Sequence, residues 1–500
     1  MALKHSADGI VTSPASLLWA RRDSELAEII EDGPPAKTWT WAQLAGGASE
    51  VASRLGSLGG DWVTVTAPNG GALVSAIFGV WLAGGVPVPI SPKLPAGERS
   101  RVLESITAER HIVAAGLGLD GQLQLDDSVL SAAVRDEPRP PKVALADPGI
   151  VLCTSGTTGR PKAIVHPMRA VWGQIDSVTR HLVDPDDLPA PTSKPPSRIE
   201  TKPMVHIGSI FGLLFSLWRG RSFVIMQRFE PVRYAELVRQ HSIDTLSLVP
   251  SMIRMMLDSQ ADVGRLAPPA KVVSSGTAAL PARWRQEFEQ RFGVPVQTTY
   301  GQTEAGTIAY EPMEDVLSGN RRAGTSGRII GQLEVEIRDE DRKPLPVGEQ
   351  GRIWIRGEAV RPSLLGDDAS RLVDGWLDTG DLGKVDADRY IYLTGRTREL
   401  IIRGGFNVIP AEVENVLMEH ANVAEAVVAG RADPRLGEVP VAWVRTAGHP
   451  LDADELVQFA RDRLAHYKVP VAVHEVSEFP RNDTGKIRKR DLRPTDAASA

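Results

Sequence analysis

The 500-residue sequence predicts an α/β protein with a large N-terminal domain and a smaller α+β domain at its C-terminus. Over the first 300 residues, helix-like and strand-like patterns alternate, which indicates mostly parallel sheets covered by helices. From about residue 320 the pattern changes to short strands and turns, typical of a small barrel. After residue 396 a separate α+β pattern follows, with helices near 410–419 and 452–465.

The first elements can be assigned in chain order. Residues 40–59 place Leu44, Ala48, Val51 and Leu55 on one helical face, and a strand-like run follows at 62–68. Residues 71–92 are the most membrane-like stretch. Because Gly84 and Gly85 interrupt the apolar run well before the roughly 20 residues that a span requires, we predict a buried helix, a turn and a strand there.

The later elements continue the alternation. Residues 183–200 are polar and rich in proline, and we predict an exposed loop there. We expect a domain boundary within 392–405, giving an N-terminal domain of residues 1–395 and a C-terminal domain of residues 396–500. The predicted strands lie at 245–250, 270–276 and 295–301, and the predicted helices at 251–259 and 282–293.

Composition excludes several classes of protein. A net charge of −6 argues against nucleic acid as the main partner, because a phosphate backbone attracts a basic face. The single cysteine, Cys153, excludes an internal disulfide and a multi-cysteine metal site, and we expect it to be a small buried residue at the end of a strand. Since no secretory signal opens the chain and no membrane span is predicted, we expect a cytoplasmic protein.

The segment 154–162, TSGTTGRPK, has the composition of a phosphate-binding loop. Its glycines let backbone N–H groups approach phosphate oxygens, its hydroxyls add donors, and Lys162 adds positive charge. It is not a Walker A loop, because a proline precedes the lysine and an alanine follows it where a magnesium-binding hydroxyl belongs. A second glycine pattern, GLGLDG at 116–121, lacks a following helix and is interpreted as a turn.

Five motifs in order resemble those of the adenylate-forming superfamily, which includes acyl-CoA synthetases, peptide-synthetase adenylation domains and firefly luciferase. Besides 154–162 they are TTYGQTEAG at 298–306, GWLDTGDLG at 375–383, GRTRELIIRGGFNVIPAEVE at 395–414 and PRNDTGKIRKRDL at 480–492. The resemblance covers nearly the whole chain and is closest to the carboxylate–CoA ligases. It implies two α/β subdomains and a small β-barrel in the N-terminal domain, followed by a mobile C-terminal domain.

The resemblance also implies a reaction and a site. A carboxylate attacks the α-phosphorus of ATP, giving acyl-AMP and pyrophosphate, and an acceptor thiol then takes the acyl group. Tyr300 would stack on adenine, Thr303 would bond the α-phosphate, Glu304 would hold Mg²⁺, and Asp381, assisted by Arg396, would bind the ribose hydroxyls. Residues implied to hold the phosphates and nucleotide are Thr154, Ser155, Gly156, Thr157, Thr158, Gly159, Lys162, Gly276 and Gly301.

The C-terminal motif implies a catalytic lysine. Lys486 would bridge the substrate carboxylate and the α-phosphate during adenylation. The basic residues around it, Arg481, Arg488, Lys489, Arg490 and Arg493, are expected to be solvated. Arg398 aligns with the hinge about which the C-terminal domain would rotate, bringing Gly404, Gly405 and Phe406 to the site for thioester formation.

The acid and the acceptor are less sharply defined. His206 resembles the histidine found in synthetases of plain carboxylic acids, whereas amino-acid-activating domains carry an aspartate nearby that pairs with the α-ammonium. No acidic residue follows His206 in residues 207–217. A pocket bounded by Ile207, Ser209, Ile210, Ser275 and Thr277 is apolar or small, which favours an uncharged aromatic or medium aliphatic acid.

The implied cofactors are ATP and Mg²⁺, with coenzyme A as co-substrate. Three alternatives stay open: an enzyme that loads a carrier protein, transfer to a non-thiol acceptor, and a catalytically silent nucleotide-binding module. The silent module is disfavoured because Lys162, Glu304, Asp381, Arg396 and Lys486 are all chemically competent. A serine hydrolase is disfavoured by the lack of a G-x-S-x-G elbow.

Overall fold

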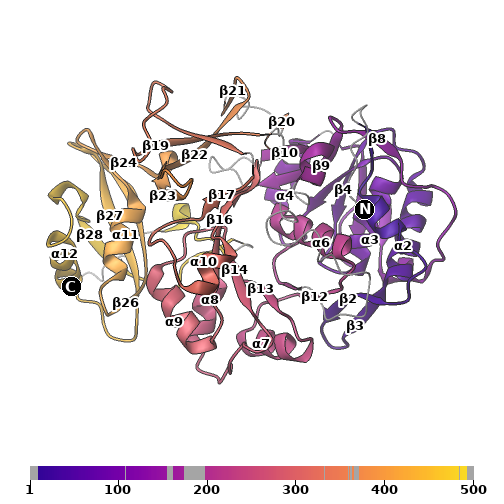
Figure 1. Ribbon diagram of the computed structural model, residues 1–500, viewed down its shortest axis with the longest axis horizontal. Helices are drawn as coiled ribbons and strands as arrows, with labels where there is room; N and C mark the ends of the chain where they lie inside the picture. Colours follow the sequence, from indigo (N-terminus) through magenta and orange to yellow (C-terminus); the bar gives the residue numbers. More distant parts are fainter. Residues whose placement is uncertain are drawn as a thin grey trace. The chain divides into compact units, whose positions relative to one another are not determined.

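The computed structural model describes residues 10–106, 108–154, 162–173, 198–331, 333–357, 360, 363–364, 371–482 and 485–492. Its contacts divide the chain into two compact units, each described here by itself (Figure 1). The first unit comprises Met1–Arg321, Ile330–Leu333 and Arg356–Gly375, and the second comprises Arg322–Ile329, Glu334–Ile355 and Trp376–Ala500.

The N-terminal sheet of the first unit is parallel, with strand order β5-β4-β6-β7. Helices α2 (Trp41–Leu55) and α3 (Gly71–Leu82) pack against each other and bury Leu44, Ala48 and Val51, as predicted. The strands are β4 (Trp62–Thr66), β5 (Val86–Ile90), β6 (Arg110–Ala114) and β7 (Leu123–Leu125). Since β7 and no helix follows 116–121, the interpretation of that glycine pattern as a turn is confirmed.

The prediction of a buried helix, a turn and a strand in 71–92 is also confirmed. Gly84 has a φ of +80°, in the left-handed region that glycine adopts without strain, and this turn leads from α3 into β5. Trp81 is buried near the end of α3 and its indole N–H donates to the carbonyl of Gly149 at 2.6 Å. None of the helices in the described part of the chain combines the length and apolar character that crossing a membrane requires.

Strands β9 (Pro148–Thr154) and β10 (Lys162–Pro167) form an antiparallel hairpin, and β20 (Ser363–Leu364) extends it. Their apolar side chains pack with those of β5 and α4 (Ala96–Glu104) in a second core. Cys153 lies in β9, one residue before its end, and burial raises the pKa of its thiol to about 12. Other elements here are β1 (Ile10–Thr12), α1 (Ala15–Trp19), η1 (Asp127–Ser131) and β8 (Lys142–Ala144).

A second sheet has the order β11-β12-β2-β3, with β3 antiparallel to its neighbour. The prediction of an exposed loop over 183–200 is wrong at its end: Ile199 and Glu200 form β11 and are buried, because they pair with the apolar strand β12. Residues 183–197 lie outside the described residues. The elements are β2 (Ala27–Asp32), β3 (Lys37–Thr40), β11 (Ile199–Glu200), β12 (Phe223–Met226), α6 (Ile207–Arg219) and α7 (Pro231–Gln240).

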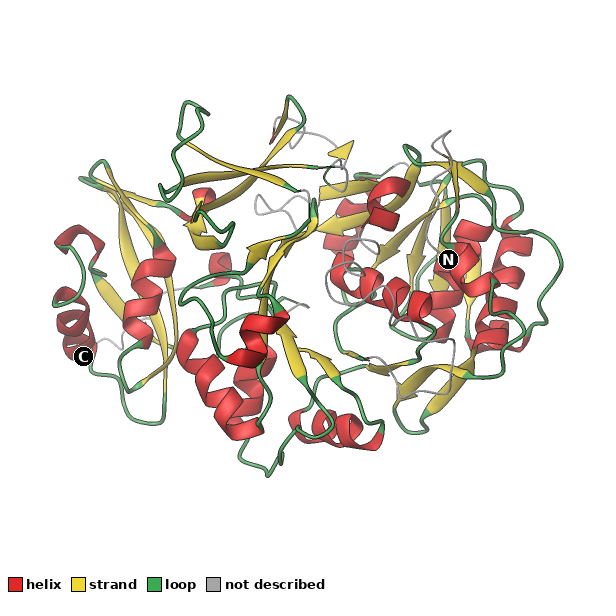
Figure 2. Cartoon of the chain, in the orientation of Figure 1, coloured by secondary structure: helices red, strands yellow, loops and turns green. Residues whose placement is uncertain are grey.

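A third sheet of the first unit contains the strands β13-β14-β15-β16, of which the first three are parallel. Figure 2 shows helices beside its strands, as expected for alternating strands and helices. The predicted strands and helices between 245 and 301 are therefore confirmed. The elements are β13 (Thr245–Ser247), α8 (Pro250–Asp258), β14 (Val272–Ser275), α9 (Ala282–Phe292), β15 (Val296–Gln302), β16 (Gly306–Tyr310) and α10 (Met313–Ser318). The first unit also contains β21 (Leu372–Val373), which is not part of this sheet.

The second unit begins with the predicted short strands. β22 pairs antiparallel with both β19 and β23, and β18 pairs with β19. A short 3-10 helix, η4, directly continues β23. The elements are β17 (Arg328–Ile329), β18 (Glu334–Arg338), β19 (Gly351–Arg356), β22 (Trp376–Val385), β23 (Ile391–Arg396) and η4 (Thr397–Glu399).

The rest of the second unit is the predicted α+β fold. The sheet has the order β25-β24-β27-β26, with β28 parallel to β27, and helices α11 and α12 share its apolar core. The elements are β24 (Ile401–Arg403), β25 (Phe406–Val408), α11 (Pro410–Met418), β26 (Val423–Asp433), β27 (Gly437–Thr446), α12 (Ala453–Arg461), η5 (His466–Lys468), β28 (Ala472–Glu475) and η6 (Lys489–Asp491).

Candidate active site

The predicted phosphate loop connects β9 to β10. Thr154 ends β9 and Lys162 begins β10, and their Cα atoms are direct partners in the antiparallel register. The intervening Ser155, Gly156, Thr157, Thr158 and Gly159 lie outside the described residues. The hairpin therefore brings the backbones of Thr154 and Lys162, the first and last residues of the motif, to neighbouring positions.

The second motif lies on the hairpin of β15 and β16. Tyr300 is buried in β15, and the register shifts between Tyr300 and Gly301. A Cβ added to Gly301 would lie 2.3 Å from the carbonyl oxygen of Gly306, so only glycine allows this close strand approach. Thr303 and Glu304 occupy the tight turn that joins the two strands.

Glu304, the predicted magnesium ligand, is paired with Arg371. The guanidinium Nη1 donates to Glu304 Oε1 at 2.8 Å, and Nη2 donates to Gln302 Oε1 at 3.4 Å. Both side chains of the ion pair are largely buried, with exposed fractions of 17% for Arg371 and 15% for Glu304. Sequence analysis missed Arg371, since it belongs to none of the motifs and lies 67 residues after its partner.

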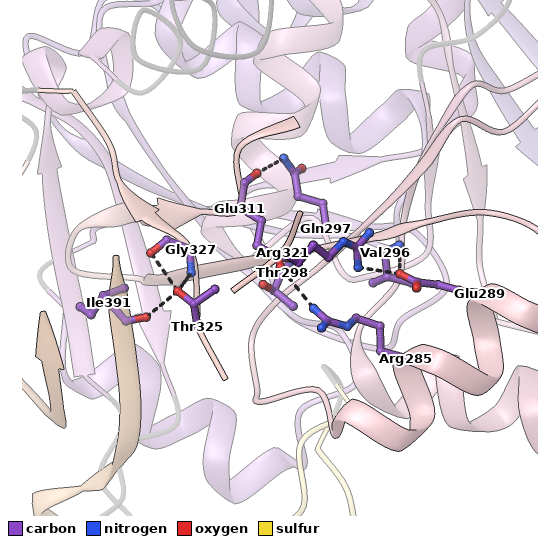
Figure 3. Close-up of polar contacts among 10 residues, drawn as sticks. All are labelled: Arg285, Glu289, Val296, Gln297, Thr298, Glu311, Arg321, Thr325, Gly327 and Ile391. Atoms are coloured by element: carbon purple, nitrogen blue, oxygen red, sulfur yellow. Dashed lines mark hydrogen bonds and ion pairs between the residues drawn. The ribbon is translucent and has the colours of Figure 1, made fainter. Parts of the chain in front are cut away.

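A buried carboxylate holds β15 in place (Figure 3). Glu311 accepts hydrogen bonds from the backbone N–H of Thr298 at 2.8 Å and from Arg285 Nη1 at 3.2 Å. The side chain of Gln297 donates to the Glu311 carbonyl at 2.7 Å. These contacts fix the strand that carries Tyr300.

The predicted pocket residues Ser275, Gly276 and Thr277 follow β14, which runs parallel to β15. Ser275 is the Cα partner of Thr298, and its carbonyl accepts the hydroxyl of Thr299 at 3.2 Å. A Cβ on Gly276 would lie 2.4 Å from that hydroxyl oxygen. The parallel register thus brings residues 275–277 beside the strand of Tyr300.

His206 is the N-cap residue of α6, whose first turns contain the predicted pocket residues Ile207, Ser209 and Ile210. The His206 carbonyl accepts the backbone N–H groups of Ser209 at 3.0 Å and Ile210 at 3.1 Å. Ser209 and Ile210 are buried, whereas His206 and Ile207 are partly exposed. The structure therefore places all four residues at one helix terminus.

In the second unit, Asp381 and Arg396 are Cα partners on β22 and β23. Arg396 Nε lies 2.9 Å from Asp381 Oδ1, and the aspartate side chain is only 5% exposed. The Thr379 hydroxyl accepts the Asp381 backbone N–H at 3.1 Å and donates to the Ile353 carbonyl at 2.8 Å. At the start of β23, the carbonyl of Ile391 accepts a hydrogen bond from the hydroxyl of Thr325 at 3.1 Å (Figure 3).

Lys486 lies within electrostatic range of Asp381, Arg396 and Glu399. Desolvation by the surrounding protein and the positive charge of Arg396 lower the pKa of the Lys486 ammonium below its usual 10.5, and the two carboxylates partly offset this effect. The side chain still reaches solvent. The structure therefore brings together the predicted catalytic lysine and the predicted ribose-binding pair, and places Arg398 in the adjoining η4.

The expectation that the basic neighbours of Lys486 are solvated is wrong for Arg481 and Lys489. Arg481 Nη2 lies 2.6 Å from Glu425 Oε1. Lys489 Nζ lies 2.8 Å from Glu399 Oε2 and 2.9 Å from Glu414 Oε1, and it also donates to the Val428 carbonyl. These carboxylates come from motif and strand positions whose proximity the sequence does not reveal.

The carboxylates of Glu399 and Glu414 stabilise the charged form of Lys489, and Lys489 stabilises that of Glu399. Burial alone would lower the pKa of Lys489, but Glu414 and Glu399 outweigh it and raise that pKa. Burial likewise opposes the charge on Glu399, yet Lys489, Lys486 and Arg396 lower the pKa of its carboxyl. Lys489 and Glu399 are therefore a charged pair at neutral pH. Arg488 and Arg490 agree with the expectation, since both are exposed.

The acidic residues of the site fit a magnesium ion that is held mainly by the phosphates of a nucleotide. Within the described residues, no group of three His, Cys, Asp or Glu side chains could hold a metal by itself. Mg²⁺ commonly binds through one or two carboxylates together with the phosphates of its nucleotide, and a single carboxylate such as that of Glu304 is compatible with this mode of binding. Arg371 shows that the Glu304 carboxylate already attracts a cation.

Comparisons with known proteins agree with these observations. The model of the AMP-binding enzyme family matches residues 19–364, and the model of the AMP-binding enzyme C-terminal domain matches residues 412–486. The chain is 30% identical to indoleacetate–CoA ligase of Aromatoleum aromaticum, over 92% of this chain and 93% of that protein. It is 34% identical to sulfoacetate–CoA ligase of Cupriavidus necator, over 89% of each chain.

A solved structure shares the fold. The o-succinylbenzoate CoA synthetase of Bacillus subtilis, in complex with its acyl-adenylate intermediate, superposes with a TM-score of 0.82 at 25% identity, over 97% of this chain and 99% of that one. The same synthetase has been solved with ATP and a magnesium ion. The expected architecture of a large N-terminal and a small C-terminal domain is confirmed by this likeness. The chain therefore belongs to the family of AMP-binding, adenylate-forming enzymes, in the branch that contains the acid–CoA ligases.

Proposed function

We propose that this protein is an AMP-forming carboxylate–CoA ligase. One oxygen of the acid attacks the α-phosphorus of ATP and pyrophosphate leaves, and the thiol of coenzyme A then attacks the acyl carbon and AMP leaves. The observation that supports this most is the position of Lys486 within electrostatic range of the Asp381–Arg396 pair. An ammonium group next to a carboxylate suited to ribose can stabilise the negative charge that develops at the α-phosphate.

In the first half-reaction, the chain's residues mainly position ATP and neutralise the negative charge of its phosphates. Thr154, Lys162 and the residues between them hold the leaving phosphates, and Thr303 bonds the α-phosphate. Tyr300, with Gly276 and Gly301 beside it, forms the adenine-binding part of the site. Bound by Glu304, Mg²⁺ supplies positive charge to the phosphates.

The acid is proposed to be an aromatic or medium aliphatic carboxylic acid without an α-amino group. No acidic residue follows His206 in residues 207–217, so the α-ammonium of an amino acid would find no counter-ion in this segment. Ile207, Ser209, Ile210, Ser275 and Thr277 are uncharged and suit an apolar acyl group. The relatives named for indoleacetate and sulfoacetate differ in their acids, so relatives alone do not define this one.

The C-terminal part is proposed to act as a mobile domain. Residues 1–395 bind ATP and acid, residues 396–500 carry Lys486, and Arg398 is the hinge between the two half-reactions. Coenzyme A is the proposed acceptor, and a carrier protein or a non-thiol acceptor is the alternative. We further propose a cytoplasmic location and no nucleic-acid partner, in line with the net charge of −6.

The test is incubation of the purified protein with Mg-ATP and a panel of aryl and aliphatic acids, with and without coenzyme A, followed by mass spectrometry. Acyl-CoA that forms with one class of acid, and that disappears in Lys486→Ala, would support the proposal. Acyl-AMP that accumulates without conversion to acyl-CoA would favour a carrier protein or another acceptor. No adenylate from any acid would contradict the proposed ligase.

A further inference from the structure

Lys486 is presented by a short hairpin. Asn482 N–H donates to the Lys486 carbonyl at 2.9 Å, and Lys486 N–H donates to Asn482 Oδ1 at 2.8 Å. On either side, Arg481 and Ile487 form an antiparallel bridge. These bonds fix the backbone of Lys486 to the hairpin, so the position of its ammonium depends on where the hairpin as a whole is held.

Two ion pairs attach this hairpin to the C-terminal sheet and its helix. Before Lys486, Arg481 pairs with the buried Glu425 on β26 at 2.6 Å. After Lys486, Lys489 pairs with Glu414 on α11 at 2.9 Å. Glu414 is itself fixed, since its Oε1 accepts the backbone N–H of Val428 at 2.8 Å.

A third ion pair links the hairpin to a different element, η4. Lys489 Nζ lies 2.8 Å from Glu399, which ends η4, and η4 continues β23 without a break. β23 carries Arg396 and pairs with β22, which carries Asp381. The Lys489–Glu399 pair thus connects the hairpin of Lys486 to η4, the short segment that contains the proposed hinge residue Arg398 and directly follows the strand of Arg396.

We propose that Glu399 is a positioning residue for adenylation, which through Lys489 fixes the Lys486 hairpin to η4, the segment that contains the proposed hinge residue Arg398. The inference rests on the proposed function, because it assumes that Lys486 serves the attack on the α-phosphorus. Lysine is a flexible point charge on a long stem, so its backbone must be placed accurately for the charge to act. A misplacement of about 1 Å at a reacting centre can cost about 100-fold in rate.

The proposal distinguishes the two half-reactions. Transfer of the acyl group from acyl-AMP to the thiol does not need Lys486 at the α-phosphate. Loss of the Glu399 contact therefore slows adenylation while leaving thioester formation from supplied acyl-AMP intact. A purely structural role would slow both steps together or lower the amount of folded protein.

The chain offers a matched pair of variants, Glu399→Gln and Glu414→Gln. Each removes one carboxylate charge from Lys489 at nearly the same distance, and the amide oxygen introduced by Glu414→Gln can still accept the Val428 N–H. We would measure acid-dependent exchange of pyrophosphate into ATP, and separately the conversion of synthetic acyl-AMP and coenzyme A to acyl-CoA. The thermal midpoint of each variant would verify that it is folded.

For Glu399→Gln we expect a fall of about 10- to 100-fold in the kcat of adenylation, with KM for ATP and thioester formation within about twofold of the wild type. Glu414→Gln should change the two half-reactions by the same small factor. Lys489→Arg should retain adenylation, and the double variant Glu399→Gln/Lys489→Gln should be no slower than Lys489→Gln alone, because the two residues act through one contact.

Equal effects of Glu399→Gln and Glu414→Gln on adenylation would overturn the inference, as would an unchanged rate in Glu399→Gln. A Glu399→Gln variant that loses both half-reactions equally would also overturn it, and so would a double variant with additive losses. These failures are distinct from failure of the proposed function, in which the wild-type protein itself forms no acyl-AMP.

Discussion

Arg371 and Glu304 form an ion pair of 2.8 Å between the carboxylate assigned to Mg²⁺ and a guanidinium from a segment outside every motif. The pair compensates the charge of Glu304, and a metal ion bound as proposed would compete with Arg371 for this carboxylate. Such competition would make the metal dependence sensitive to a residue that does not contact the metal.

We therefore expect Arg371→Gln to lower the Mg²⁺ concentration at which ATP-dependent pyrophosphate exchange is half-maximal. Because this pair is largely buried, its coupling should exceed the roughly 1 kcal/mol of exposed pairs, so the shift should be more than about fivefold. Binding of Mn²⁺ to the ATP complex, followed by electron paramagnetic resonance, should tighten in parallel. If the half-maximal Mg²⁺ concentration rose and Mn²⁺ bound more weakly, Arg371 would orient Glu304 for the metal instead of competing with it.

The lowered pKa of Lys486 predicts the alkaline limit of adenylation. The reaction needs the ammonium form, so the rate falls as pH rises through a pKa that lies below the usual 10.5 of lysine. Lys486→Arg should reduce the maximal rate but shift this alkaline limit upward, because a guanidinium does not titrate in this range. A pH profile of kcat for adenylation measures both effects, and identical alkaline limits in the two proteins would contradict the assignment.

The close packing at Gly301 predicts that any side chain at this position lowers the free energy of unfolding. Gly301→Ala would place a Cβ 2.3 Å from the Gly306 carbonyl oxygen, so β15 and β16 must separate at a cost of about 1–3 kcal/mol in unfolding free energy. Gly208→Ala in α6 is the control, since no heavy atom lies within 4 Å of its added Cβ. Urea unfolding should show a loss for Gly301→Ala and no loss for Gly208→Ala. Equal stability of the two variants would contradict this account.

The free energy of unfolding should depend on the negative charge of the buried Glu200. Its carboxylate lies 2.8 Å from Arg198 Nη2 and 3.9 Å from Lys202 Nζ. Glu200→Gln would leave two largely buried cations, Arg198 and Lys202, without this counter-charge, and the free energy of unfolding should fall by up to about 3–5 kcal/mol.

Part of that cost should disappear at alkaline pH. Burial lowers the pKa of Lys202 below its unfolded value of 10.5, so between the two pKa values the unfolded state binds more protons and stability rises with pH. Loss of Glu200, which raises that pKa, widens this window. The deficit of Glu200→Gln relative to the wild type should therefore be smaller in urea unfolding at pH about 9.5 than at pH about 7. A deficit that grows with pH would exclude the role of Lys202.

The parts of the fold that could be predicted from the sequence are those governed by local patterns. The face of α2 follows from the spacing of Leu44, Ala48 and Val51, and the end of α3 follows from Gly84 and Gly85. The proximity of Asp381 and Arg396 follows less directly, from motifs that resemble a known family. The two helix features depend on residues close together in the sequence, and the Asp381–Arg396 proximity depends on motifs whose function is known in a family.

What could not be predicted depends on tertiary partners. Lys489 resembles a solvated lysine in a basic run, and only the fold brings Glu399 and Glu414 to it. Ile199 and Glu200 continue a polar, proline-rich segment, yet they pair with β12 and become buried. Arg371 gives no local signal, since its partner Glu304 is 67 residues away.

The register of β9 and β10 has a consequence for how the phosphate motif tolerates change. Thr154 and Lys162 are opposite one another, so the seven residues between them begin and end about 5 Å apart, whatever path they take. For stability, an added or deleted residue within 155–161 leaves the pairing of Thr154 with Lys162 intact, and the entropy of closing such a segment changes little with length. A one-residue insertion within β10 would instead send every following side chain of the strand to the opposite face of the hairpin. A change of length between the two residues should therefore spare the fold and act on phosphate binding alone, whereas one within β10 should destabilise the hairpin itself.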